Sequence, residues 1–172
     1  MGKNCLFTLM IMAVLVSASC GYRFAGSADA IDPSIRHVYV APFINATSEA
    51  LIENYLRNDF IDRFRRGGRF SIAGNAEDGD ALVRGTVTNV FTSRATYTTA
   101  ESAIEDRIHM SLDLIFEERS GDILWSQKGF SGTEVYRVSD DPGTTERSRS
   151  AALKKLSSDL AERAYRTMLS GF

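Results

Sequence analysis

Two segments of the chain repeat apolar residues at helical spacing. The first carries Ile52, Leu56, Phe60 and Phe64, and Asn45-Ala46-Thr47-Ser48 ahead of it offers N-cap candidates. The second carries Leu153, Leu156, Leu160, Ala164 and Met168 after the break at Asp140-Asp141-Pro142-Gly143. The spacing therefore predicts two amphipathic helices, each with one face for a core.

Other segments alternate apolar and polar residues or are rich in β-branched and aromatic residues, which is typical of strands. Such segments span residues 37–43, 70–72, 80–97, 107–116 and 123–136. In the long segment, Ala81, Val83, Val87 and Phe91 are expected on one face. The last three strands follow each other through short turns, which favours an antiparallel meander. We predict an α+β fold with the two helices packed on a small, mostly antiparallel sheet of about four strands.

The first residues form a separate pattern that is typical of a secretory signal peptide. Lys3 precedes an almost unbroken apolar run over residues 5–16, and small residues lead into Cys20. The stretch Val16-Ser17-Ala18-Ser19-Cys20 resembles a lipobox, so residues 1–19 are expected to be removed and Cys20 to carry acyl chains. The alternative is ordinary cleavage that leaves Cys20 as a free thiol. Gly21 favours the outer membrane, residues 20–35 are expected to be a tether or edge segment, and residues 36–172 a single domain.

Composition excludes several classes of function. The formal net charge is −2 over 172 residues, so no overall field favours nucleic acid. The chain has no GxSxG, HExxH or CxxC signature, and its two histidines, His37 and His109, fall on different predicted strands. We therefore expect a binding or assembly protein with no enzymatic activity, no cofactor and no metal site.

Four basic residues are the candidates for contact with an anionic ligand. Arg84 and Lys128 lie within predicted strands, and Arg94 and Arg107 lie near the tip of the first hairpin. Cations grouped on a sheet can bind the phosphates of a glycolipid through charge-assisted hydrogen bonds. The alternative is that they are scattered over the solvent face of the sheet without a ligand.

Three motifs resemble those of the LptE family, the lipopolysaccharide-assembly lipoproteins. They are Cys20-Gly21-Tyr22-Arg23-Phe24, the run from Val38 to Asn45, and the run from Ala81 to Val87. The resemblance implies an acylated outer-membrane lipoprotein without catalytic residues, which plugs the β-barrel LptD, aids its assembly and contacts lipopolysaccharide. It also implies that Arg94 and Arg107 are the nearest matches by location to the family's ligand-contacting basic residues.

Two other hypotheses remain. The run from Val40 to Thr47 before a helix also occurs in regulatory lipoproteins of the peptidoglycan-synthase-activator or curli-secretion type. About 15 residues separate Cys20 from the first strand, a reach of at most roughly 50 Å, which favours a role close to the membrane. A periplasmic hydrolase would have to depend on His37 or His109, whose more ordinary place is the surface.

Overall fold

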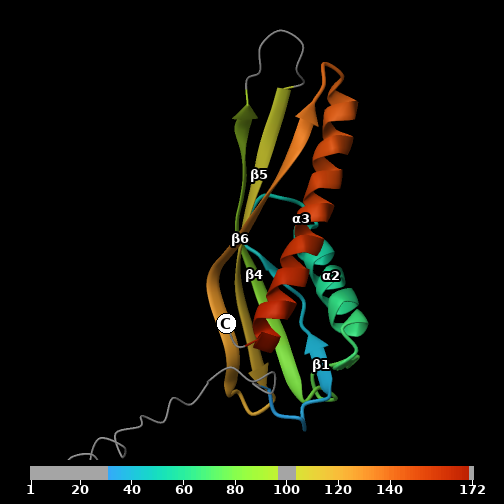
Figure 1. Cartoon of the computed structure of the whole chain (residues 1–172), viewed down its shortest axis with the longest axis vertical. Coiled ribbons are helices and arrows are strands. Elements are labelled where there is room, and N and C mark those ends of the chain that lie inside the picture. The colour runs from blue at the N-terminus through green and yellow to red at the C-terminus, as the bar shows by residue number, and fades with distance from the viewer. Residues whose placement is uncertain (1–30, 97–103, 171–172) are drawn as a thin grey trace, which may run out of the picture.

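Three long antiparallel strands form the frame of the structure, β4 (Ala81–Thr96), β5 (Ile104–Glu118) and β6 (Ile123–Val138). They run along the long axis of the molecule in Figure 1. The computed structural model describes residues 31–96 and 104–170. The predicted meander is confirmed, and the buried positions of β5 are the predicted ones, Ile108, Met110, Leu112, Leu114 and Phe116.

Three short strands extend the sheet in the parallel sense, β1 (His37–Val40), β2 (Ile44–Asn45) and β3 (Ser71–Ile72). The strand order is β3-β1-β4-β5-β6, with β2 also on β4. The α+β class is confirmed, but the sheet has six strands instead of about four and is mixed. The strand predicted over residues 37–43 ends at Val40, since Pro42 has no N–H to donate to a ladder, and β2 begins only at Ile44.

Both predicted helices are present and cover the same face of the sheet, α2 (Ile52–Arg66) and α3 (Pro142–Ser170). Every residue of the two predicted stripes is buried, and the stripes meet the inward side chains of β4 and β5 in one core. Figure 1 shows that α2 covers only the lower half of the long strands, beside which β1 also lies, whereas α3 runs along most of their length. At about 1.5 Å per residue, the 29 residues of α3 span roughly 43 Å.

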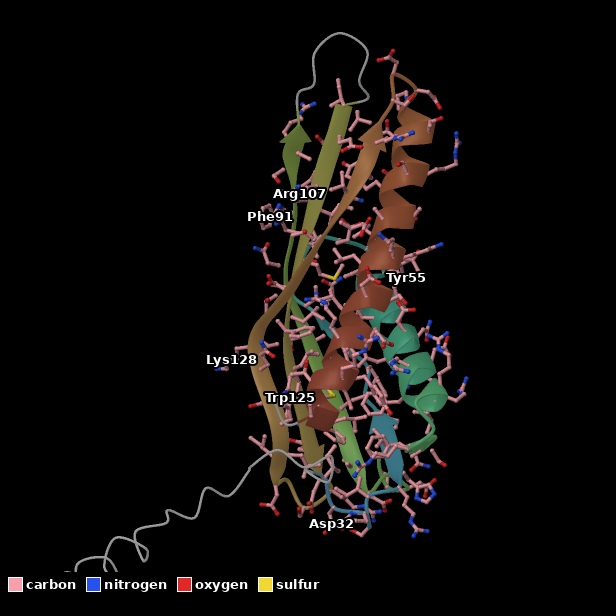
Figure 2. The ribbon with its side chains drawn as sticks, in the orientation of Figure 1. Asp32, Tyr55, Phe91, Arg107, Trp125 and Lys128 are labelled. Atoms are coloured by element: carbon pink, nitrogen blue, oxygen red, sulfur yellow. The ribbon has the colours of Figure 1, made fainter. Side chains whose placement is uncertain are left out.

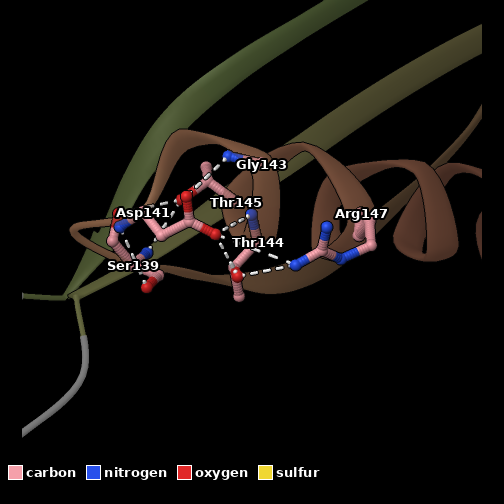
Figure 3. A network of polar contacts seen from close by, with 6 residues as sticks. All are labelled: Ser139, Asp141, Gly143, Thr144, Thr145 and Arg147. Atoms are coloured by element: carbon pink, nitrogen blue, oxygen red, sulfur yellow. Dashed lines mark hydrogen bonds and ion pairs between the residues drawn. The ribbon is translucent and has the colours of Figure 1, made fainter.

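The two helices begin in different ways. Asp141 caps α3 by accepting the backbone N–H of Thr144 at 2.8 Å, and Arg147 donates to the Thr144 hydroxyl at 2.8 Å (Figure 3). The hydroxyl of Thr144, which also donates to Asp141, is the largest cause of the lowered pKa of this carboxyl, followed by the Thr144 N–H. By contrast, α2 follows Leu51 with no side-chain cap, so the N-cap predicted within residues 45–48 was wrong. Asn45 and Thr47 instead form hydrogen bonds within the loop, and Asn45 also donates to Glu53 in the first turn of α2.

The start of the described chain is attached to the lower end of the sheet. Ile31 and Ile35 are buried in the core, and Arg69 donates to the carbonyl of Ile31 at 2.6 Å. The carboxylate of Asp80 accepts the backbone N–H groups of His37 at 2.8 Å and Arg36 at 3.0 Å. These two bonds, with that of His37 the larger, lower the pKa of Asp80 to about 2. The folded body therefore includes residues that precede β1.

Candidate functional site

A bulge in β4 decides which side chains reach the face of the sheet opposite the helices, which we call the outer face. The pairing of β4 with β5 shifts between Val87 and Asn89. One extra residue in a strand moves every following side chain to the other face. Phe91 therefore pairs with His109 on the outer face, and its predicted placement on the face of Val83 and Val87 was wrong.

Phe91, His109 and Ser93 form a cluster on the outer face. The rings of Phe91 and His109 are stacked, with centroids 4.4 Å apart and an interplanar angle of 1°. His109 Nε2 lies 2.9 Å from the Ser93 hydroxyl oxygen. Phe91 remains 48% exposed, so the cluster presents a flat aromatic surface among hydrophilic neighbours. The predicted placement of His109 on the polar face of its strand is confirmed, but its stacking with Phe91 was not predicted.

The two histidines do not form a site together. His37 begins β1 and its Nδ1 lies 3.2 Å from Asp80, whereas His109 is on β5. The strand β4 separates β1 from β5 in the sheet. Within residues 31–96 and 104–170, no group of three or more His, Cys, Asp or Glu side chains is placed to hold a metal ion.

Arg94 and Arg107 are neighbours in register but point to opposite faces. Arg107 pairs with Ser93, on the outer face, and its side chain is exposed near Phe91 (Figure 2). Arg94 pairs with Asp106, and its Nε lies 3.4 Å from the Asp106 carboxylate. The bulge is the cause, because it places Arg94 on the side of the helices.

Arg84 and Lys128 lie in the lower half of the sheet. Arg84 Nη2 is 2.7 Å from the Glu117 carboxylate on the outer face. Lys128 is exposed on β6, within the register shift that separates Gln127 from Phe130 (Figure 2). At about 3.3 Å per residue, Arg84 lies roughly 25 Å along the sheet from Ser93. The four predicted cations therefore form two separate groups.

The four predicted cations also differ in whether a carboxylate pairs with them. Arg84 and Arg94 each have a carboxylate partner, Glu117 and Asp106. In the described part of the chain, Arg107 and Lys128 form no ion pair. A cation already held by a carboxylate has less to gain from a phosphate than one in contact with water alone. Of the four predicted cations, Arg107 and Lys128 are thus the two most available to a ligand.

Charged residues also join the helices to each other and to the loop before α2. Arg149 forms a two-pronged ion pair with Glu49, and Arg63 pairs with Glu162. The buried Ser157 donates its hydroxyl to Asp59 at 2.5 Å. Burial raises the pKa of Asp59, and the hydrogen bond from Ser157 opposes that shift. These contacts connect the two helices to each other and to the loop before α2.

Sequence patterns could not have located the aromatic cluster. A strand bulge leaves no mark in the alternation around Val87, because Asn89 and Val90 fit either face.

The predicted lipidation site, Cys20, lies outside the described residues. No helix in the described part of the chain is both long and apolar enough to span a membrane.

Comparison with known proteins gives the same fold in solved structures at low sequence identity. A candidate lipoprotein from Caulobacter crescentus CB15 is 11% identical, with a TM-score of 0.55 over 77% of this chain and 88% of that chain. The protein CT253 from Chlamydia trachomatis is 8% identical, with a TM-score of 0.51 over 80% of this chain and 99% of that one. A minor lipoprotein from Acinetobacter baumannii is 11% identical, with a TM-score of 0.50 over 80% and 95%. These likenesses support the fold alone.

Sequence comparison identifies the family. No curated protein matches the chain at a significant level. The family model LptE, described as lipopolysaccharide-assembly, matches residues 35–168. The match begins at Ile35, which is buried in the core, and ends at Met168 in the last turns of α3, so it covers nearly all of the described fold. The chain therefore belongs to the LptE family of lipopolysaccharide-assembly proteins.

Proposed function

We propose that this protein is an outer-membrane lipoprotein that plugs a β-barrel of the LptD type. In this proposal residues 1–19 are removed, Cys20 carries the acyl chains, and the domain that follows aids assembly of the barrel. It also takes part in the transfer of lipopolysaccharide to the outer leaflet and performs no catalysis. The family match over residues 35–168 is the observation that carries the proposal.

The outer face has the chemistry that a plug in a hydrated lumen requires. Its exposed or half-buried side chains are mostly hydroxyls and amide-sized polar groups that can exchange hydrogen bonds with water or a barrel wall. They include Thr86, Thr88, Ser93, Ser111, Ser131 and Thr133. These uncharged polar side chains can lie against a polar wall without leaving a buried charge unpaired.

Recovery of the barrel tests the proposal directly. The acylated protein, purified from gently solubilised membranes, should bring an outer-membrane barrel with it in equal amounts. Depletion of the protein should leave lipopolysaccharide on the periplasmic side. Recovery as a free lipoprotein, together with normal surface lipopolysaccharide, would refute the proposal.

The anchor is tested separately at Cys20. Mass spectrometry of the mature amino terminus should find Cys20 as the first residue, carrying acyl chains. The variant Cys20→Ser should be released from the membrane fraction, since two or more acyl chains are what give stable anchoring. An unacylated terminus, or a retained leader, would contradict this part of the proposal.

Lipopolysaccharide contact is proposed for the four cations, with Arg107 and Lys128 ahead of Arg84 and Arg94. The first two have no ion pair in the described structure, so their replacement removes a contact to phosphate and disturbs no partner. We expect Arg107→Ala or Lys128→Ala to weaken binding of the purified protein to lipopolysaccharide several-fold. The matched control is Arg66→Ala, because Arg66 is an exposed cation at the end of α2, away from the sheet, and forms no ion pair in the described structure. An equal loss in the control would show that only net charge matters.

A further inference from the structure

The segment that joins β2 to α2 exposes two large aliphatic side chains. Ile44 is 64% exposed and Leu51 is 58% exposed, the first at the start of β2 and the second directly before α2. We call residues 44–51 the β2–α2 segment. It lies halfway along the body, where β2 pairs with Thr86 and Val87 at the middle of β4. Figure 1 shows the same connection at mid-height.

Leu51 is held in a backbone conformation that leucine rarely adopts. Its φ is 65° and its ψ is 5°, and among the described residues it is the one non-glycine residue with positive φ. The left-handed conformation is unfavourable for a side chain with a Cβ, whereas glycine adopts it freely and asparagine tolerates it. Because the Leu51 side chain is mostly exposed, its packing contacts within the protein do little to offset the cost of this conformation. Residues held in such conformations cluster at sites of binding and catalysis.

Hydrogen bonds hold the β2–α2 segment in one shape. The Asn45 amide donates to the carbonyl of Glu49 at 2.7 Å and to the Glu53 carboxylate at 2.9 Å. Its oxygen accepts the backbone N–H of Thr47 at 2.9 Å. Glu49 is in turn held by Arg149 of α3. The two aliphatic side chains are therefore presented on a rigid support, which lowers the entropic cost of binding.

The exposed residues of this segment carry no charge. They are Ile44, Ala46, Ser48, Ala50 and Leu51. The charge of Glu49 is offset by Arg149, and no basic residue within the segment would attract an anionic bilayer surface. An uncharged surface with protruding aliphatic side chains fits the apolar centre of a protein interface. Its place midway along the body fits a partner that surrounds the body better than a membrane beneath one end.

We propose that the β2–α2 segment is a docking point for the partner barrel, with Leu51 and Ile44 inserted into apolar hollows of the barrel's inner surface. This rests on the proposed function, because the barrel is the partner assigned there. The strained conformation of Leu51 directs its side chain outward, and the bonds around Asn45 keep it there before the partner arrives.

Leu51→Gly separates a docking role from a structural one. Glycine suits the φ of 65°, so the thermal stability of the variant should equal or exceed that of the wild type. Recovery of the barrel with the purified acylated protein should nevertheless fall on the order of ten-fold, as for a residue at the centre of an interface. Lower thermal stability together with reduced recovery would assign Leu51 to the fold and overturn the proposal.

A matched pair of isoleucines provides the control. Ile44 and Ile123 are 64% and 63% exposed, and each begins a strand. We expect Ile44→Ser to reduce recovery of the barrel and Ile123→Ser to leave it unchanged. If Ile44→Ser, Ile123→Ser and Leu51→Gly all recover as much barrel as the wild type, the docking proposal is overturned, although the barrel remains the partner.

Two further outcomes identify other failures. If the wild-type protein recovers no barrel, the proposed function fails and the docking proposal falls with it. If the Leu51 and Ile44 variants recover the barrel normally but float less well with vesicles of anionic phospholipid, the segment contacts the bilayer and the docking proposal is wrong.

Discussion

The close contact between Gly85 and Phe43 allows a stability change to be worked out from the structure. Gly85 is buried in β4, and a Cβ built on it would lie 2.0 Å from Phe43 Cε1 and 2.3 Å from Cδ1. Ordinary contact between carbon atoms is about 3.5–4.0 Å, so Gly85→Ala requires the ring to move by roughly 1.5 Å. The ring has nowhere to go, because it packs against the fully buried Phe60 with centroids 5.1 Å apart.

Forced overpacking of this kind typically costs about 1–3 kcal/mol, and a displaced ring in a closed core belongs near the upper end. In a domain of this size, each kcal/mol lowers Tm by roughly 3–4 °C, so Gly85→Ala should lower Tm by about 10 °C. Thermal unfolding followed by circular dichroism measures the shift. Gly74→Ala is the matched control, since Gly74 is exposed and an added Cβ there meets nothing within 4 Å.

A second substitution shows whether the clash is the cause. Phe43→Leu shortens the side chain and makes room for the methyl group that Gly85→Ala adds. The double variant should therefore lose less stability than the sum of the two single variants, by about 1 kcal/mol or more. If Gly85→Ala unfolds within about 0.5 kcal/mol of the wild type, or if the two losses simply add, the packing argument is refuted.

Two carboxylates should give stability changes of opposite pH dependence. Burial raises the pKa of Asp59, so the stability contributed by its protonated form is lost as pH rises through the folded-state pKa. Asp59→Asn keeps an acceptor for Ser157, and in urea unfolding it should be more stable than the wild type at neutral pH and lose that advantage in acid. The Thr144 hydroxyl and N–H lower the pKa of Asp141, so its contribution is present above the usual value of 3.8 and is lost as pH falls. Asp141→Ala should therefore lower Tm at neutral pH and have little effect in strong acid; the same loss at both pH values would contradict the capping role.

The helical stripes and the strands of the meander were predictable because they follow from periodicity within one segment. The spacing of Ile52, Leu56, Phe60 and Phe64 has one helical solution, and all four are fully buried. The alternation in β5 likewise places the apolar residues on one face only, so that face must be the one that packs in the core. The parallel strands β1 and β2 were less accessible, because their partner β4 lies some forty residues further along the chain. Pairing across that distance is decided by how α2 packs, and no local pattern records it.

The candidate site was predictable only in part, for a related reason. The sequence places Arg94 and Arg107 near one hairpin tip, and the structure confirms that they are neighbours in register. Their faces depend on the bulge after Val87, a single register shift that local alternation does not reveal. The strained conformation of Leu51 also could not be predicted, because a leucine before a helix gives no indication of its own φ.

The two halves of β4 are under different constraints, and this difference bears on function. Up to Val87 the inward residues are fully buried between the sheet and the helices, so the core requires them. Beyond the bulge, from Asn89 to Ala95, no residue of β4 is buried. An exposed strand edge is a hazard for aggregation unless something covers or uses it. The strand nevertheless continues, paired with β5 and carrying Phe91 outward and Arg94 on the opposite face. Among the described residues of this half, Val90 packs against the core and the others face outward or are exposed. We therefore expect this half to contribute mainly through contacts outside the chain, and Arg107, a proposed contact to lipopolysaccharide, pairs with it from β5.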